Sequence, residues 1–363
     1  MSAPQEDLQR LRQRVADLDR EILEKVAERL QTSRRIGEAK RRAQLPLRDF
    51  RVEAQVMQRG RELARNLGFD PSLAESILES LIEAAVKTQA EDQVVTSPQG
   101  LRRILLVGSE GRMGRWLRRF LLGQGHQVEG FDLAGEPEFT DLDAARQHAF
   151  ELVFLCTPLA MLPESLEQCL DWPGNPVVCD IGSLKSHLVQ PLRQAVARGY
   201  RVTSLHPMFA PGTVVLTGRT VLVCDAGDGE ATERACSLFR DTAVSLCPIA
   251  LEDHDRVMGA LLGLSHTVNL LFGQALSQLG VGFAELGPIA STTFSKQART
   301  AAEVAAENPE LYHQIQSLNQ HTPQVYDALE ASLKALRAAA TDEDSSAFLG
   351  LMEGCRGYFF PGG

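Results

Sequence analysis

The chain has 363 residues, of which 44% are hydrophobic and 23% charged, a composition typical of a globular protein with two or three domains. Its net charge of −10 argues against nucleic acid or an anionic membrane surface as a partner. No apolar run approaches the ~18 residues of a membrane span, and the first residues, MSAPQEDLQR, lack the apolar core of a signal peptide. Seven cysteines without a C-x-x-C pair indicate reduced thiols, so we expect a cytoplasmic protein.

The first 90 residues have a helical pattern and no strand pattern. Apolar residues recur at spacings of 3, 4, 3 and 4 from Leu8 to Ile22, which predicts a long helix with one apolar stripe. Pro46 should end that helix. A second helix is expected over 49–66 and a third over 72–91, where Asp70-Pro71-Ser72 is a start signal. Residues 93–100 are predicted to be a linker to the next domain.

From residue 101 onward, short β-branched runs alternate with helical stretches. This alternation predicts a mostly parallel α/β sheet of the Rossmann type over 101–250. From about 251 the pattern is helical to the end. We therefore expect three domains: all-α over 1–92, α/β over 101–250 and all-α over 251–363. The predicted strands are Ile104–Val107, Val128–Asp132, Leu152–Cys156, Val177–Asp180, Val202–His206, Thr220–Cys224 and Val244–Cys247.

Cations lie on the apolar stripe of the N-terminal helices. At 100° per residue, Arg29 and Lys40 project within about 20° of each other on that stripe. Gln89 falls on the stripe of the third helix. A buried cation is costly unless it is paired, so these residues form either an Arg–Glu pair inside a bundle or a pocket for a small anion with several carboxylates. Arg12 projects roughly 100° away from Arg29 and is better placed to serve the pocket of another protomer.

A glycine-rich turn links the first predicted strand to a helix expected at Arg115–Leu122, which is the arrangement of a dinucleotide-binding turn. Its spacing is G-x-x-G-x-x-G, with Ser109 at the usual first glycine. Asp132 ends the second strand, where a carboxylate binds both ribose hydroxyls and favours NAD over NADP; the alternative is a solvated strand end. The predicted cofactor site consists of Gly108, Ser109, Gly111, Arg112, Met113, Gly114, Asp132 and Thr157.

His206 ends the fifth predicted strand, directly before Pro207. Ligands bind at the carboxyl ends of parallel strands, so His206 is a candidate base that takes a proton from a substrate hydroxyl. Ser183 follows the preceding strand and is placed to hydrogen-bond this histidine, and Lys185 adds positive potential or is structural. The alternative is a histidine that only satisfies its loop. No metal-ligand set is predicted in the chain.

The segments LRQRVADLD, VAERL, IGEAK and LPLRDF resemble the all-helical chorismate mutases over residues 8–92. The resemblance implies an intertwined dimer in which Arg29 and the partner's Arg12 hold the two carboxylates of chorismate. It also implies that Lys40 and Gln89 hydrogen-bond the ether oxygen, with Asp49 and Glu53 near the ring hydroxyl. The rearrangement is pericyclic, so the site needs no nucleophile. Val52 and Ala85 depart from the family pattern, where Arg and Ser are usual.

The motifs VGSEGRMG, CTP, DIGSLK, LHPMF and Ser265-His266 resemble the prephenate dehydrogenases over residues 102–330. The resemblance implies that His206 accepts a hydrogen bond from the ring hydroxyl of prephenate, while a hydride leaves to NAD⁺ and the ring carboxylate is lost. It places His266 in the substrate pocket and makes Arg299 the clamp on a substrate carboxylate. Four extra residues separate Arg299 from Asn308-Pro309.

The two resemblances together imply a bifunctional, homodimeric enzyme of tyrosine biosynthesis that turns chorismate into prephenate and then into 4-hydroxyphenylpyruvate. Tyrosine is a possible feedback inhibitor. One alternative is an arogenate dehydrogenase of the same fold, which an acidic residue at the side-chain end of the pocket would favour. Another is a mutase-derived module that only dimerises and senses a ligand. The joint presence of Arg12, Arg29, Lys40, Glu53 and Gln89 speaks against that module.

Overall fold

The computed structural model describes residues 3–42, 50–89, 102–240, 242 and 244–361; for 3–6, 41–42, 50–51 and 86–89 it describes the backbone alone. Two compact units are present. One comprises Met1–Thr157, Met161–Gly182 and Gln190–Ile249, and the other comprises Pro158–Ala160, Ser183–Val189 and Ala250–Gly363. Within the described ranges, no helix is long and apolar enough to cross a membrane. The predicted linker at 93–100 and the helix-ending Pro46 lie outside the described residues.

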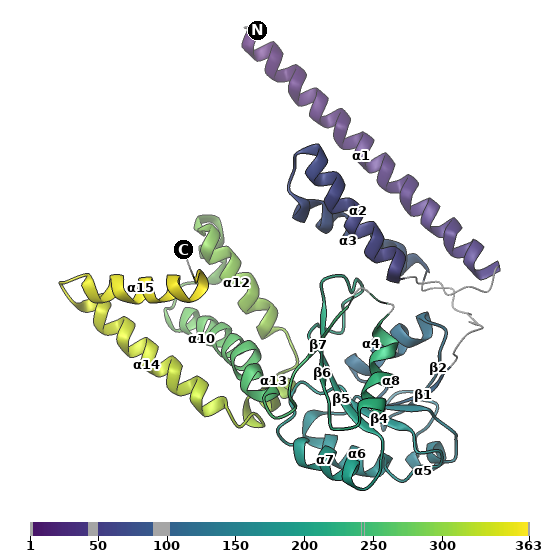
Figure 1. Ribbon diagram of the computed structural model, residues 1–363. Coiled ribbons are helices and arrows are strands. Elements are labelled where there is room, and N and C mark those ends of the chain that lie inside the picture. Colours follow the sequence, from purple (N-terminus) through teal and green to yellow (C-terminus); the bar gives the residue numbers. More distant parts are fainter. Residues whose placement is uncertain (1–2, 43–49, 90–101, 241, 243, 362–363) are drawn as a thin grey trace. The chain divides into compact units, whose positions relative to one another are not determined.

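Three helices form the N-terminal domain (Figure 1): α1 (Ala3–Arg42), α2 (Phe50–Leu67) and α3 (Pro71–Gln89). The predicted start signal of α3 is formed as expected, because the carboxylate of Asp70 accepts a hydrogen bond from Ser72 N at 2.9 Å. That bond lowers the pKa of Asp70. Helix α3 contacts both α1 and α2, while the apolar stripe of α1 from Leu8 to Ile22 stays largely exposed.

A seven-stranded sheet is the centre of the α/β domain, in the order β2-β1-β3-β4-β5-β6-β7. The first five strands in that order are parallel, β6 is antiparallel to β5, and β7 is parallel to β6. The mostly parallel sheet predicted from the sequence is thereby confirmed. The strands are β1 (Arg103–Val107), β2 (Gln127–Phe131), β3 (Leu152–Leu155), β4 (Val177–Asp180), β5 (Val202–Pro207), β6 (Thr220–Cys224) and β7 (Ser245–Pro248).

Helices cover both faces of this sheet. Along the sheet, the connection from β1 to β2 leads toward one end, whereas the connections β2 to β3, β3 to β4 and β4 to β5 lead toward the other end. Right-handed crossovers therefore put α4 (Arg112–Gly123) on one face and α5 (Leu142–Arg146), α6 (Leu162–Cys169) and α7 (Val189–Ala197) on the other. Helix α8 (Gly229–Arg240) shares the face of α4, since Phe120 of α4 stacks on Phe239 of α8 at 4.9 Å. Strands β1, β3 and β4, buried on both faces, form the core.

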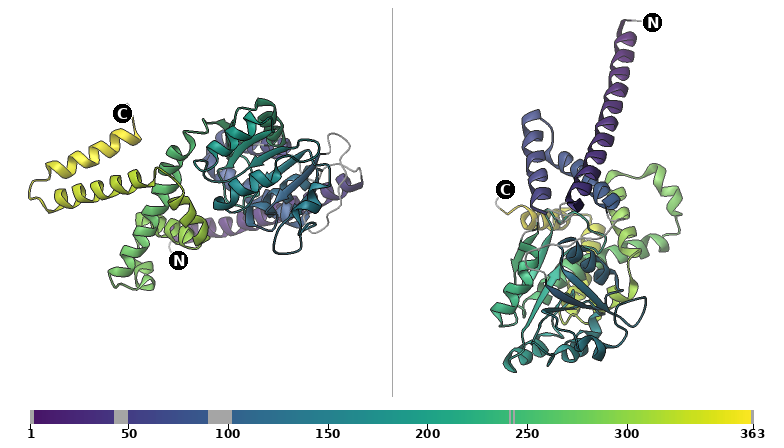
Figure 2. Two further views of the ribbon diagram at one scale, coloured as in Figure 1. Left: turned by 90° about the horizontal axis from the view of Figure 1, so that it is seen from below. Right: turned by 90° about the vertical axis from the view of Figure 1, so that its right-hand side faces the viewer.

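The rest of the chain is helical, as predicted. Helices α10 and α12 pack against each other, and α14 and α15 form an antiparallel pair that is seen in the left view of Figure 2. A π-helical turn, η2, joins α9 to α10 without a break. The elements are α9 (His254–Met258), η2 (Gly259–Leu264), α10 (Ser265–Gln278), α11 (Phe283–Leu286), α12 (Thr292–Ala305), α13 (Pro309–Ser317), α14 (Thr322–Thr341) and α15 (Ser346–Phe359), with a short 3₁₀ turn at Leu159–Met161 and another at Gly287–Ile289.

The packing of α4 on β1 requires Gly114. A Cβ at this position would lie 2.2 Å from the Gly108 carbonyl oxygen, and backbone atoms cannot yield as a flexible side chain can. We predict that Gly114→Ala destabilises the α/β domain by about 1–3 kcal/mol, the usual cost of overpacking. Its melting temperature should fall in a thermal unfolding scan.

The matched control is Gly229→Ala at the first position of α8, where a Cβ would meet no atom within 4 Å. This variant should melt at or slightly above the temperature of the parent, because alanine is the better helix former. Equal melting temperatures for the two variants would contradict the close approach at Gly114.

Candidate functional site

The glycine-rich turn after β1 bends at Gly108, which has φ of +87°. A Cβ at Gly108 would lie 2.8 Å from the carbonyl of Cys156, so only glycine fits there. The N–H groups of Gly108 and Ser109 both donate to Phe131 O, at 2.8 and 3.2 Å. Ser109, at the usual first glycine, has no positive φ and is fully buried, with its Oγ beneath Gly130. The turn that leads from β1 into α4 is therefore hydrogen-bonded to the end of β2, with an ordinary backbone conformation at Ser109.

Helix α4 begins three residues earlier than the sequence pattern predicts, at Arg112. Its N-cap is Gly111, which is exposed and makes no side-chain capping bond. A helix N-terminus without a side-chain cap binds anions well, because its first N–H groups and the helix dipole face outward. The turn thus fits the pyrophosphate of a dinucleotide.

Asp132 lies directly after β2, where it was expected. Its Oδ2 accepts a hydrogen bond from Glu110 N at 2.8 Å, and its Oδ1 accepts one from Ala134 N at 3.2 Å. These two bonds fix the carboxylate beside the glycine turn. Each oxygen keeps a further lone pair, which fits two ribose hydroxyls.

Further polar groups line the same edge of the sheet. Thr157 follows β3, and its Oγ1 lies 3.1 Å from Ser165 Oγ of α6. Asp180 ends β4 and accepts a hydrogen bond from Gly182 N at 2.9 Å. Cys156 ends the predicted third strand, directly before Thr157. Burial and, to a smaller extent, the charges of Asp132 and Asp180 raise the pKa of its thiol. Cys156 is therefore neutral and is not a nucleophile.

His206 is the penultimate residue of β5 and is 4% exposed. It pairs across the antiparallel ladder with Leu222 of β6. Its Cα is fixed by strands on both sides, since β5 also pairs with β4. The histidine thus stands on a rigid element at the edge of the sheet that carries the glycine turn, as the strand pattern predicts.

In the helical unit, His266 is half-buried in the first turn of α10 and stacks on the ring of Tyr312 from α13, with centroids 4.1 Å apart. Burial lowers the pKa of His266, which favours the neutral imidazole. Its Nδ1 is buried and has no hydrogen-bond partner among the described residues. Arg299, on α12, is exposed. Tyr312 was missed by sequence reasoning, because a lone tyrosine gives no signal.

The π-helical turn η2 precedes His266 and changes the phase of the helix. The carbonyl oxygen of Gly263 in this turn accepts two side-chain hydrogen bonds, from Thr267 Oγ1 at 2.8 Å and from Gln316 Nε2 at 3.1 Å. The face of α10 that meets Tyr312 is thereby set by η2. The sequence contains no local signal for such a turn.

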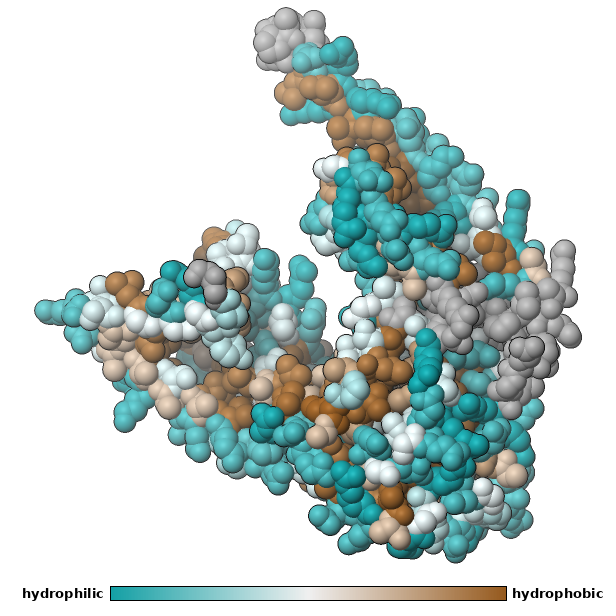
Figure 3. Space-filling model, in the orientation of Figure 1, coloured by the Kyte–Doolittle hydropathy of each residue, from teal (hydrophilic) through white to brown (hydrophobic). Residues whose placement is uncertain are grey.

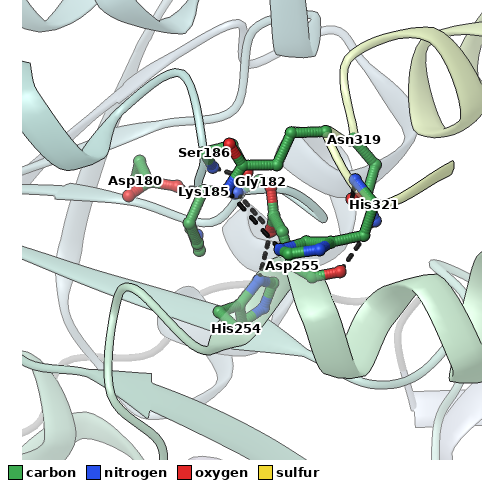
Figure 4. Close-up of polar contacts among 9 residues, drawn as sticks. Asp180, Gly182, Lys185, Ser186, His254, Asp255, Asn319 and His321 are labelled. Atoms are coloured by element: carbon green, nitrogen blue, oxygen red, sulfur yellow. Dashed lines mark hydrogen bonds and ion pairs between the residues drawn. The ribbon is translucent and has the colours of Figure 1, made fainter. Parts of the chain in front are cut away.

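Ser183 is half-buried and belongs to the same unit as the C-terminal helices. Next to it in sequence, Lys185 and Ser186 donate backbone hydrogen bonds to the carboxylate of Asp255, at the start of α9 (Figure 4). Sequence reasoning did not identify Asp255, since its partners lie 70 and 69 residues away in the chain.

In the N-terminal domain, α1 runs unbroken through Arg29 and Lys40, both half-buried. Arg29 Nη1 donates to the carbonyl of Leu81 on α3 at 3.2 Å, and burial lowers its pKa. Among the described residues, no carboxylate pairs with Arg29, so the Arg–Glu pair considered from sequence is not formed at Arg29.

The other predicted mutase residues have different positions. Arg12 is exposed on α1 and Glu53 is half-buried on α2. Gln89 is the last residue of α3, where the backbone alone is described, and Asp49 lies outside the described residues. Of the two departures from the family pattern, Val52 is 47% exposed and Ala85 is buried.

Three family models match the chain in this order. Chorismate mutase type II matches residues 11–90, the prephenate dehydrogenase nucleotide-binding domain matches 124–258, and the prephenate dehydrogenase dimerization domain matches 250–354. The glycine turn lies just before the second of these matches. The three matches agree with the all-α, α/β and all-α architecture.

Relatives and solved structures agree with this assignment. A T-protein of Enterobacter agglomerans is 26% identical over 311 residues, which cover 85% of this chain and 81% of the relative. A T-protein of Haemophilus influenzae is 22% identical over 356 residues, 98% of this chain and 93% of the relative. The crystal structure of prephenate dehydrogenase from A. aeolicus with hydroxyphenyl propionate and NAD⁺ has a TM-score of 0.58 at 18% identity and covers 72% of this chain and 98% of its own.

The half-buried cations of the N-terminal helices lie within the chorismate mutase match, and the histidine on β5 lies within the nucleotide-binding match, which begins just after the glycine turn. The chain belongs to the bifunctional chorismate mutase–prephenate dehydrogenases, which use NAD.

Proposed function

We propose that the mutase reaction takes place around the half-buried guanidinium of Arg29. The observation that supports this is its environment: one N–H donates to the neutral Leu81 carbonyl, and among the described residues no carboxylate neutralises its charge. Such a cation is suited to a dicarboxylate substrate, because an incoming carboxylate replaces the water lost on burial.

The remaining mutase roles follow from the family resemblance. Arg29 and the partner's Arg12 hold the two carboxylates of chorismate. Lys40 and Gln89 donate hydrogen bonds to the ether oxygen, where negative charge develops as the carbon–oxygen bond breaks. Asp49 and Glu53 lie near the ring hydroxyl. Catalysis consists of holding a compact conformer and stabilising that oxygen.

Lys40 provides the test of this arrangement. We predict that Lys40→Ala lowers mutase turnover by ~10² or more, the cost of deleting one oxyanion-type donor. The disappearance of chorismate is followed by its absorbance. Prephenate oxidation by the same preparation should stay near the parent rate, because it takes place in another domain.

The control is Arg34→Ala, which removes an exposed cation from another face of α1. It should leave both activities within about twofold of the parent, as is usual for surface substitutions. Parallel loss of both activities in folded Lys40→Ala protein would mean that the two reactions share one site.

For the dehydrogenase we propose that His206 takes the proton of the prephenate ring hydroxyl. Bound NAD⁺ would supply the acceptor for the hydride that leaves the ring carbon bearing this hydroxyl. Departure of the ring carboxylate as CO₂ returns its bond pair to the ring, which becomes aromatic. The sequence position of Ser183 makes it the proposed hydrogen-bond partner of His206, and the family resemblance assigns His266 and Arg299 as residues that hold the substrate. The cofactor is held by the glycine turn and by Asp132, with Thr157 beside them.

The prediction for His206 concerns rate and pH. His206→Asn should lower kcat by roughly 10²–10⁴, the range for a positioned general base. The kcat profile of the parent should fall on the acidic side, because a protonated imidazole cannot accept the hydroxyl proton. That acidic limb should be missing in the variant, while NAD⁺ binds with near-parent affinity in a fluorescence titration. A variant that keeps the limb would assign the base to another group, such as His266.

Three further features are proposed. A homodimer is supported by the match to a dimerization domain and by the row of exposed apolar side chains along α1, among them Leu11 (54%) and Ile22 (60%), visible as a brown stripe in Figure 3. Tyrosine, which shares the hydroxyphenyl ring and carboxylate of the product, is proposed as an inhibitor. A cytoplasmic location is supported by seven free cysteines.

A further inference from the structure

Asp255 is a buried carboxylate with a complete set of donors. It is 2% exposed. Its oxygens accept hydrogen bonds from Lys185 N at 2.8 Å and from Ser186 N at 2.7 Å. Its Oδ1 also lies 2.7 Å from His254 Nδ1 (Figure 4). Burial alone raises the pKa of Asp255, but the hydrogen bonds outweigh burial and lower the pKa to about 2. The group is therefore an anion at any pH at which the enzyme works.

The two backbone donors belong to the segment Ser183–Val189, which connects β4 to α7. Leu188 N and Val189 N both bond to Lys185 O, at 2.7 and 3.0 Å, so the segment is a tight turn. Its first N–H groups point at the carboxylate of Asp255 as the N-terminus of a helix points at its cap. A second contact supports the turn, because His187 Nε2 lies 2.8 Å from Leu159 O of the same unit.

The backbone of Asp255 is held as well. Its carbonyl oxygen accepts a hydrogen bond from Asn319 Nδ2 at 2.8 Å. Asn319 Oδ1 in turn accepts one from His321 N at 2.9 Å, directly before α14 begins. Asn319 is itself 3% exposed. The anchor of the turn is thus fixed from the opposite side, and the turn belongs to the same compact unit as the C-terminal helices.

Ser183 lies two residues before the first anchored N–H. We propose that Asp255 is a positioning residue of the dehydrogenase: by holding Lys185 N and Ser186 N, it attaches the turn that carries Ser183 to the C-terminal helices and so sets the place of the Ser183 hydroxyl. This inference rests on the proposed role of Ser183. Asparagine cannot replace the carboxylate, because its NH₂ group would face an N–H donor and leave it unsatisfied.

The test is a double-mutant cycle on the full-length enzyme, with prephenate and NAD⁺ as substrates. Asp255→Asn should lower kcat about 10- to 100-fold, since a displacement of about 1 Å at a catalytic group costs up to 10²-fold. The same change made in the Ser183→Ala protein should lower kcat by less than about threefold, because the effects of two residues that act through one another are not additive. Mutase turnover by the same samples should stay at the parent rate.

The matched control is Asp253→Asn. Asp253 is two residues away and its side chain is 58% exposed; among the described residues this side chain pairs only with Arg256. It should leave kcat unchanged. An unchanged kcat in Asp255→Asn, or equal losses in the presence and absence of the Ser183 hydroxyl, would overturn the inference. Should Asp255→Asn not fold, Asn319→Ala replaces it in the cycle, because it loosens the anchor and leaves the carboxylate intact.

Amide hydrogen exchange separates this inference from the proposed function. Asp255→Asn should raise exchange in the peptide over 183–189, and Asp253→Asn should not. If Ser183→Ala has parent kcat, the proposed role of Ser183 fails, and with it the catalytic part of the inference; faster exchange would then leave Asp255 a purely structural anchor. Unchanged exchange would overturn the anchor itself.

Discussion

Parallel pairing of β2, β1, β3, β4 and β5 is the constraint on which the dehydrogenase site depends. Because parallel strands end on the same edge, each strand delivers its following residues to one side of the sheet. The turn at Gly108, the carboxylate of Asp132 and the imidazole of His206 reach that edge from three different strands. The order reverses between β1 and β3, at the point where the glycine turn meets the residues after β3. These three groups would not meet at one edge if one of these strands were antiparallel.

The two reactions need different chemical groups from the protein. A pericyclic rearrangement needs cations and amides that fit one conformer of a dianion, and α-helices deliver these from a stripe with regular spacing. Hydride transfer needs a base beside a bound nucleotide, which the edge of a parallel sheet delivers. Arg29 lies on a helix and His206 lies at the end of a strand, which suits the role proposed for each. This difference in chemistry is consistent with one chain that combines an all-helical domain with an α/β domain.

The sequence predicts most of what depends on local pattern. The stripe from Leu8 to Ile22, the strands and the glycine turn all follow from periodicity and turn chemistry, and the structure contains them with shifts of a few residues. Contacts between distant segments were not predicted. Asp255 meets Lys185 across 70 residues, and His266 meets Tyr312 across two helices. No periodicity encodes such pairs. The π-helical turn η2 was also missed, because its carbonyl at Gly263 is satisfied by Gln316 from another helix.

The most direct test of the account is to incubate the purified protein with chorismate, with and without NAD⁺, and to identify the products. Without the nucleotide, prephenate should accumulate and the reaction should stop there. With NAD⁺, 4-hydroxyphenylpyruvate, CO₂ and NADH should form in equal amounts. Two results would contradict the presence of two working sites in one chain. One is an absorbance of chorismate that does not change at any enzyme concentration, and the other is prephenate that persists when NAD⁺ is present.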